Sequence, residues 1–160
     1  MADGRGSRRL GADLYCPAPE VATPTVHEDG CILQIATRQV ADTVIAAPSG
    51  RIDHHSAASF EAALSPLVAS VVASRGSLVL DFSGIEYISS VGLRVLMIAA
   101  KQMREHEGRL VVAALQGVVA EIFAISRFDR ILTVTATLDD AMALCSPETL
   151  AQYRSAGPAR

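Results

Sequence analysis

Residues 78–96 read LVLDFSGIEYISSVGLRVL, and this stretch decides the fold. Its apolar start, residues 78–82, predicts a buried strand, and the apolar spacing from Leu93 onward predicts a helix. Two neighbouring hydroxyl groups, those of Ser89 and Ser90, stand on the link before that helix. A helix start presents unpaired backbone N–H groups and a partial positive charge. A serine there can cap the helix or carry a phosphate close to those donors, which makes a regulatory switch an attractive hypothesis.

Strands and helices alternate on both sides of this stretch. We expect the other strands at residues 32–36, 43–47, 110–114 and 131–134, and the other helices at residues 60–71, 118–125 and 137–144. Pro66 should kink or shorten the first helix, because proline removes a backbone donor. Thr137 and Asp140 resemble a capping box at the start of the last helix. The alternation predicts an α/β fold: a single mixed sheet of four to five strands with helices mainly on one face.

The two ends of the chain lack this patterning. Residues 1–30 contain scattered glycines, arginines and prolines, and they predict a flexible N-terminal extension. Residues 147–160 predict a flexible C-terminal tail. Between them, residues 31–146 are expected to form one domain that folds without either end.

The composition excludes several classes of function. The chain has 160 residues, of which 50% are hydrophobic but only 4% aromatic, so a stacking platform for single-stranded nucleic acid is not expected. A net charge of −3 leaves no basic footprint for nucleic acid. Three widely separated cysteines suit a reducing compartment and provide no disulfide framework. Without a run of about 18 apolar residues, we expect a soluble cytoplasmic protein with no direct membrane insertion.

Catalytic and metal-binding patterns are not evident. Asp53, His54 and His55 precede a predicted helix, but adjacent histidines rarely direct both rings to one ion, so we expect a surface turn with Ser56 as helix cap. The sequence contains neither a nucleophile elbow nor a glycine-rich phosphate loop. We therefore expect no enzymatic activity, no cofactor and no metal site.

The quoted stretch resembles the signature of the STAS domain family, which comprises the anti-sigma factor antagonists and their relatives. The family pattern is Asp-apolar-Ser, followed a few residues later by apolar-Asp/Ser-Ser-small-Gly-Leu, and residues 81–83 and 88–93 match it. Residues 50–55, GRIDHH, match an earlier strand-to-helix turn of the same family. The resemblance covers roughly residues 32–145 and implies the STAS fold.

The resemblance also indicates which hydroxyl carries the switch. In sporulation-type members the phosphoacceptor serine directly precedes the glycine, but here that position is Val91, which has no hydroxyl. The preceding residue, Ser90, is the acceptor in other branches of the family. Many relatives carry Asp where Ser89 stands, which suits a helix cap. Ser90 is therefore the expected phosphorylation site, with Ser89 as the alternative.

The expected partner-binding surface combines the turn after the second strand, the end of the central strand and the helix start. Its residues are Asp53, His54, Ser83, Ser89, Ser90, Val91, Gly92 and Arg94. Gly92 permits close approach of a partner or close packing of helix on strand. Ser83 can instead close a turn with Asp81. Arg94 is either a solvated residue or a charged contact.

The function implied by the resemblance is partner switching. The unmodified protein would bind an anti-sigma factor that is also a serine kinase, phosphorylation would dissociate the pair, and a PP2C-type phosphatase would restore the hydroxyl. The alternative is a scaffold subunit of a membrane lipid-transport ATPase, a role that STAS-like chains also fill.

Overall fold

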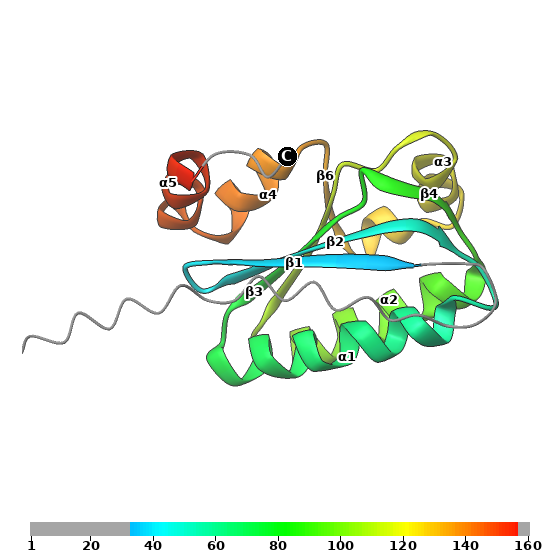
Figure 1. The fold of residues 1–160 in the computed structure, drawn as a ribbon, viewed down its shortest axis with the longest axis horizontal. Helices are drawn as coiled ribbons and strands as arrows, with labels where there is room; N and C mark the ends of the chain where they lie inside the picture. Colours follow the sequence, from blue (N-terminus) through cyan, green and yellow to red (C-terminus); the bar gives the residue numbers. More distant parts are fainter. Residues whose placement is uncertain (1–32, 157–160) are drawn as a thin grey trace, which may run out of the picture.

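The computed structural model describes residues 33–156, which form a six-stranded sheet with helices on both faces (Figure 1). The strands are β1 (Gln34–Val40), β2 (Thr43–Ile52), β3 (Ser77–Asp81), β4 (Gly84–Ile88), β5 (Arg109–Ala113) and β6 (Thr133–Thr135). The helices are α1 (Ala57–Ser74), α2 (Ser90–Glu105), α3 (Gly117–Ile125), the 3-10 turn η1 (Phe128–Arg130), α4 (Leu138–Cys145) and α5 (Pro147–Ala156). The expected N-terminal extension, residues 1–30, lies outside the described residues.

The sheet is mixed, with the order β1-β2-β3-β5-β6. β1 and β2 form an antiparallel hairpin around the turn at Ala41 and Asp42, whereas the remaining pairs are parallel. β3 pairs with the first half of β2, and β4 pairs with its second half. The long strand β2 is therefore shared by two shorter parallel strands that follow each other in the chain.

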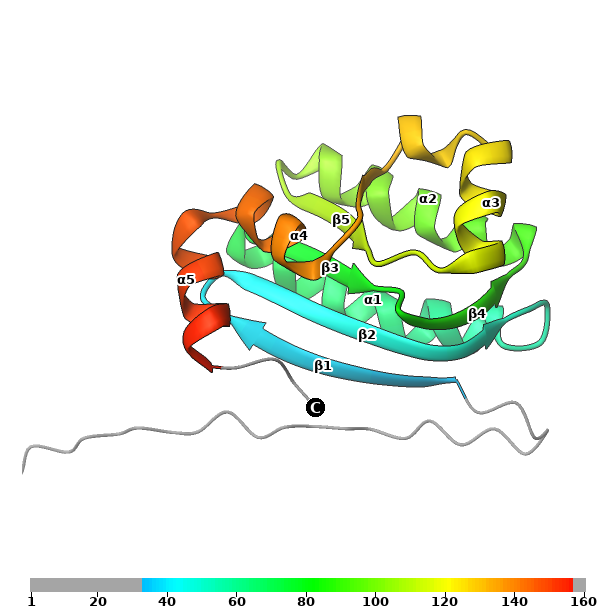
Figure 2. The ribbon, with the colours of Figure 1, turned by 90° about the horizontal axis from the view of Figure 1, so that it is seen from above.

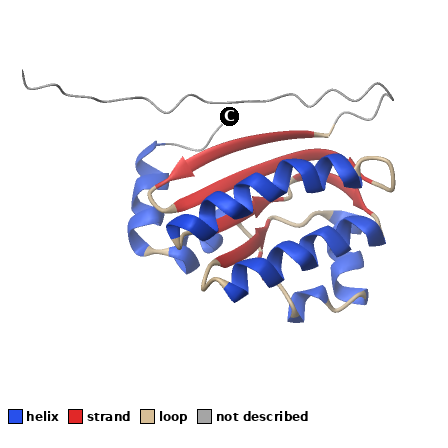
Figure 3. Cartoon of the chain, turned by 90° about the horizontal axis from the view of Figure 1, so that it is seen from below, coloured by secondary structure: helices blue, strands red, loops and turns tan. Residues whose placement is uncertain are grey.

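The central strands are buried on both faces. On β3, Leu78 and Leu80 belong to the larger core cluster, together with residues of α1 and α2, and Figure 3 shows these two helices side by side over the strands. Val79 points to the opposite face, where Ala141 of α4 joins a smaller cluster. This double burial explains why residues 78–80 read as an uninterrupted apolar run.

Helix α1 is apolar because it is a core helix. By length and composition alone, with a mean hydropathy of 1.4, it could cross a membrane. However, its apolar residues Phe60, Leu64 and Val68 lie in the core of the domain. Of the two effects expected of Pro66, a kink or a shorter helix, the second does not occur, because α1 runs on to Ser74. Pro66 is exposed, so water can bond the carbonyl that the proline leaves without a donor.

The predicted α/β fold is confirmed, with more strands than the four to five expected. The additional strand is β4, which the sequence assigns to a link. The pairing of β4 with β2 shifts register so that Gly50 faces Ile85 and Arg51 faces Tyr87. Glu86 is thereby left over, and Ile85 and Ile88 are both buried although they are three residues apart. This irregularity removes the alternating pattern by which a strand is recognised.

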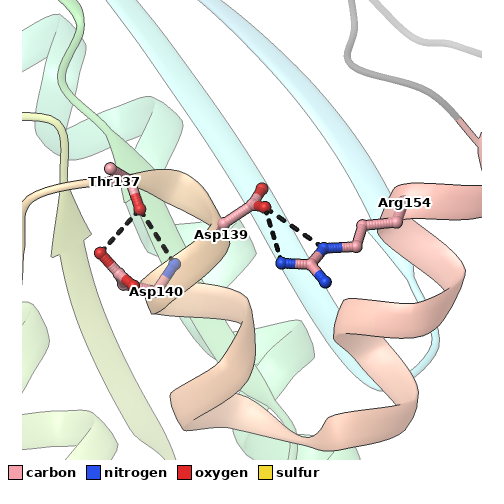
Figure 4. Close-up of polar contacts among 4 residues, drawn as sticks. All are labelled: Thr137, Asp139, Asp140 and Arg154. Atoms are coloured by element: carbon pink, nitrogen blue, oxygen red, sulfur yellow. Dashed lines mark hydrogen bonds and ion pairs between the residues drawn. The ribbon is translucent and has the colours of Figure 1, made fainter.

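Most of the expected C-terminal tail is helical rather than irregular. Residues 147–156 form α5, which packs against α4 and against β1 at the edge of the sheet (Figure 2). The predicted cap of α4 is confirmed, since the Thr137 hydroxyl accepts the Asp140 N–H at 3.1 Å and donates to its carboxylate at 2.7 Å (Figure 4). Asp139 forms an ion pair with Arg154 of α5 at 3.2 Å.

Buried hydroxyl groups join α5 to the sheet. Thr149 is fully buried, and its hydroxyl lies 3.4 Å from that of Thr43 and donates to the Asp42 carboxylate at 3.3 Å. A buried hydrogen bond contributes more to stability than an exposed ion pair, because an unpaired group there cannot turn to water. The Thr149 contacts should therefore contribute more to the free energy of unfolding than the Asp139–Arg154 pair does.

This difference is measurable by urea denaturation. We expect Thr149→Val to lower the free energy of unfolding by about 1–2 kcal/mol, because it deletes the hydroxyl that faces Thr43 and Asp42. Arg154→Ala should cost less than about 1 kcal/mol, because both partners of its ion pair are exposed. A larger loss for Arg154→Ala than for Thr149→Val would show that the ion pair holds α5 in place.

Candidate functional site

The candidate site lies where β2 and β4 end together. The two strands run parallel with Ile52 opposite Ile88, and the Ser89 N–H donates to the Ile52 carbonyl at 2.7 Å. The chain segments that follow these strands therefore start next to each other, at the right-hand end of the sheet in Figure 1. This places the turn of residues 53–56 beside Ser89 and Ser90.

The turn after β2 is closed by Asp53. Its carboxylate accepts the backbone N–H of His55 at 2.9 Å and of Ser56 at 3.0 Å. The Ser56 hydroxyl makes no capping bond to α1; instead it donates to the Arg51 carbonyl at 2.7 Å and accepts the Asp53 N–H at 2.9 Å. The expectation that Ser56 caps the helix is thus wrong, because its hydroxyl is engaged with the backbone of Arg51 and Asp53.

The Asp53 turn also sets the electrostatics of this corner. Donation from the Ser56 N–H holds the pKa of the Asp53 carboxyl below its ordinary value of 3.8, despite partial desolvation that acts in the opposite direction. His54 and His55 are exposed, and their ring centroids lie 5.8 Å apart at a steep angle. Within residues 33–156 no group of three or more His, Cys, Asp or Glu side chains is arranged to hold a metal ion.

The two serines at the start of α2 differ in their hydrogen bonding. Ser89 has extended backbone angles, φ −86° and ψ 167°, and its hydroxyl accepts the Gly92 N–H at 3.3 Å, so the predicted cap is confirmed. Ser90 is the first residue of α2 and is exposed. Its hydroxyl forms no hydrogen bond with any residue in the described part of the chain. Of the two hydroxyls, that of Ser90 is available to a second protein.

Gly92 allows α2 to approach the two strands closely. A Cβ atom at this position would lie 2.5 Å from Cγ2 of Ile52 and 2.9 Å from Cγ1 of Ile88. Gly92 itself is buried. Of the two alternatives for this residue, the geometry supports close packing of helix on strand, and it fixes the start of α2 against the ends of β2 and β4.

The exposed side of α2 continues the surface around Ser90. Val91 is 39% exposed, Met97 43% and Ile98 42%, and Arg94 is exposed between them. We call Ser90, Val91, Arg94, Met97 and Ile98 the outer face of α2. The sequence prediction omitted Met97 and Ile98, although their spacing of three and four residues from Arg94 was a usable signal.

Ser83 lies apart from this site. It precedes β4, whereas Ser89 and Ser90 follow it, so the whole strand separates them. The Ser83 N–H donates to the Asp81 carboxylate at 3.0 Å. This is the turn with Asp81 that the sequence analysis gave as the alternative to partner binding. Asp53, His54, Ser89, Ser90, Val91 and Arg94 are thus gathered at one end of β4, while Ser83 is at the other.

Comparison with known proteins gives a consistent result. A family model described as STAS domain matches residues 34–141, a range that includes the whole site. BtrV of Bordetella bronchiseptica, named as an anti-sigma factor antagonist, is 34% identical over 111 residues, which cover 69% of this chain and 93% of BtrV.

Solved structures are similar over the same part of the chain. An anti-sigma factor antagonist from Mycobacterium paratuberculosis is 26% identical with a TM-score of 0.60, covering 69% of this chain and 92% of that protein. The Bacillus cell fate determinant SpoIIAA in its phosphorylated form is 17% identical with a TM-score of 0.54, covering 70% and 99%. The second likeness concerns the fold alone.

The role of Gly92 leads to a first prediction for the site. We expect Gly92→Ala to lower the free energy of unfolding by about 1–3 kcal/mol, because the added methyl must displace Ile52 and Ile88. The gain in helix propensity, about 1 kcal/mol, offsets only part of this cost. Urea denaturation measures the effect, with Ser90→Ala as an exposed control within about 0.5 kcal/mol of the unsubstituted protein. A Gly92→Ala variant as stable as the control would contradict the packing role.

The Asp53 turn leads to a prediction about pH. Because the folded state lowers the pKa of Asp53, this carboxylate contributes stability that is present above its unfolded value, near pH 4, and is lost as pH falls through its folded value. Asp53→Asn removes the charge but keeps an oxygen acceptor. We expect this variant to be less stable at pH 7 and to match the unsubstituted protein well below pH 4. Parallel denaturation curves from pH 7 to pH 2.5 test this, and a difference independent of pH would refute it.

Proposed function

This chain belongs to the STAS domain family, and we propose that it acts as an anti-sigma factor antagonist controlled by phosphorylation of Ser90. The unmodified protein binds an anti-sigma factor that is also a serine kinase. That kinase transfers a phosphoryl group to Ser90, and the two proteins separate. A PP2C-type phosphatase restores the hydroxyl and with it the binding-competent form.

One observation carries the choice of residue. Two serines stand side by side, but the hydroxyl of Ser89 is engaged with the Gly92 N–H while the exposed hydroxyl of Ser90 makes no bond within residues 33–156. Modification of Ser89 would cost the cap of α2, whereas modification of Ser90 would leave every described contact in place. Val91, which follows, offers no hydroxyl.

The relatives support a switch of this kind. BtrV is named as an anti-sigma factor antagonist, and SpoIIAA has been solved in a phosphorylated form. In this chain Ser90 follows a strand and a helix cap within the residues that the family model covers. We carry over the role of a phosphorylated regulator and assign it to Ser90 from the geometry described above.

The physical effect of the phosphate falls mainly on the partner. A phosphate adds about −1.5 to −2 charges at pH 7. Because Ser90 stands in the first turn of α2, where the helix dipole favours negative charge, the domain itself can accept the modification. A partner surface fitted to a neutral hydroxyl would have to desolvate the charge, and like charges across an interface cost several kcal/mol. The complex would then dissociate without refolding of the domain.

The proposed partner surface consists of the outer face of α2 and the neighbouring turn with Asp53 and His54. The exposed apolar residues Val91, Met97 and Ile98 supply area that a partner can bury, and Arg94 supplies a charge. Gly92 is buried and Ser83 is distant, so neither belongs to this surface. The protein is regulatory in this scheme, works in the cytoplasm, and uses the Mg-ATP of its kinase rather than a cofactor of its own.

The assignment to Ser90 is tested with the cognate kinase. We expect Ser90→Ala to abolish phosphorylation with little change in stability. Ser90→Asp should weaken binding to the anti-sigma factor. Ser89→Ala should lose about 0.5–2 kcal/mol of stability as a missing cap, yet should remain phosphorylated on Ser90. Mass spectrometry after incubation with kinase and Mg-ATP locates the phosphate, and calorimetry measures binding.

Two outcomes would contradict the proposal. A phosphate on Ser89 with Ser90 unmodified would show that the cap is opened during the reaction. Stable partner binding without phosphate on either serine would speak for a constitutive scaffold.

A further inference from the structure

Arg94 is the one basic residue of α2 without a hydrogen bond or ion pair within the described residues. The helix carries two other cationic side chains: Lys101 pairs with Glu105 at 3.8 Å, and Arg104 donates to the Ile131 carbonyl at 3.0 Å. The Arg94 side chain is exposed and forms no hydrogen bond or ion pair with any residue in the range 33–156. The first turn of α2 contains no acidic residue that could pair with it.

Ser90 and Arg94 occupy neighbouring places on the exposed side of this helix. They are four residues apart, a spacing that brings Cβ atoms to about 5–6 Å on a helix surface. Side chains on a helix lean toward its N-terminus, so that of Arg94 is directed back toward Ser90. The flexible arginine stem spans this distance, and the planar guanidinium matches two oxygens of a phosphate.

The charged residues of the neighbouring turn, Arg51 and Asp53, already have partners of their own. The Arg51 guanidinium lies 4.8 Å from the centroid of the Tyr87 ring, in a cation–π contact. The Asp53 carboxylate, which would repel a phosphate, is engaged by the N–H groups of His55 and Ser56. His54 and His55 are exposed and titratable, so any test that varies pH has to account for them.

We propose that Arg94 binds the phosphate of phosphorylated Ser90 within the same helix, through a bidentate ion pair across one turn. The inference rests on the proposed function, since it concerns the modified form of the same serine. In the unmodified protein Arg94 is free to meet a carboxylate on the partner. After modification it is held by the phosphate, so one covalent change both adds a negative charge and withdraws a positive one from the outer face of α2.

The pair is detectable in the isolated protein with phosphoserine placed at position 90 during translation, which needs no kinase. We expect the second pKa of the phosphoserine, followed by ³¹P NMR, to rise by about 0.5 unit in Arg94→Gln, because the ion pair favours the dianion. Arg94→Lys should recover only part of the difference, since an ammonium lacks the planar fork. In the ¹H–¹⁵N spectrum, the Arg94 Nε–H resonance should shift on phosphorylation and move with the phosphate titration.

Two controls separate the ion pair from general charge effects. Lys101→Gln removes the same charge from the same helix, about three turns from Ser90, and should leave the phosphate pKa within about 0.1 unit. Repeating the measurement in a His54→Gln/His55→Gln background removes the two exposed histidines of the neighbouring turn. Circular dichroism checks that each exposed substitution leaves the fold intact.

Equal shifts in Arg94→Gln and Lys101→Gln, or no shift in either, would overturn the proposed ion pair. An Arg94 Nε–H chemical shift that does not change on phosphorylation would also overturn it. Because the phosphoserine is installed directly, these results are independent of whether a kinase modifies Ser90. Failure of the kinase experiment would refute the proposed function while this measurement still decides the role of Arg94.

Discussion

The parallel pairing of β2 with β4 is the constraint on which the candidate site depends. It aligns Ile52 with Ile88 and ends in the hydrogen bond from the Ser89 N–H to the Ile52 carbonyl. The pairing thereby places Asp53 beside Ser89, although they lie 36 residues apart in the sequence. Gly92 completes the arrangement, because any larger side chain would push α2 away from Ile52 and Ile88.

This construction makes the site rigid without a dedicated core of its own. Backbone hydrogen bonds fix the strand ends, Asp53 closes one turn, and Ser89 caps the helix that follows the other. None of these contacts involves the outer face of α2. A change in charge on that face can therefore alter what the protein binds while the scaffold beneath it stays the same, which is the physical requirement for a switch that acts without refolding.

The sequence was sufficient where the signal was local and failed where it depended on distant partners. The buried strand β3, the Ser89 cap and the Thr137 cap were readable from apolar runs and from hydroxyls at helix starts. β4 was missed because Glu86 interrupts its alternation, and only the pairing with Gly50 and Arg51 explains that irregularity. The sequence does not predict α5 because its only fully buried residue is the polar Thr149, and Leu150 and Tyr153 are too few to form a clear apolar stripe. The position of Ser56 before α1 predicts a cap, but the sequence does not show that its hydroxyl turns back to the Arg51 carbonyl and the Asp53 N–H.

The difference between Ser89 and Ser90 shows how backbone geometry assigns roles to chemically identical residues. Ser89 is extended, so its hydroxyl turns back to the Gly92 N–H, whereas Ser90 is already helical and its exposed hydroxyl makes no hydrogen bond within residues 33–156. In the proposed function, a kinase would meet one engaged hydroxyl and one free hydroxyl, together with an arginine one turn further along the helix. The specificity of such a site is thus set before any partner binds, by the position at which α2 begins, and that position is fixed in turn by the pairing of β4 with β2.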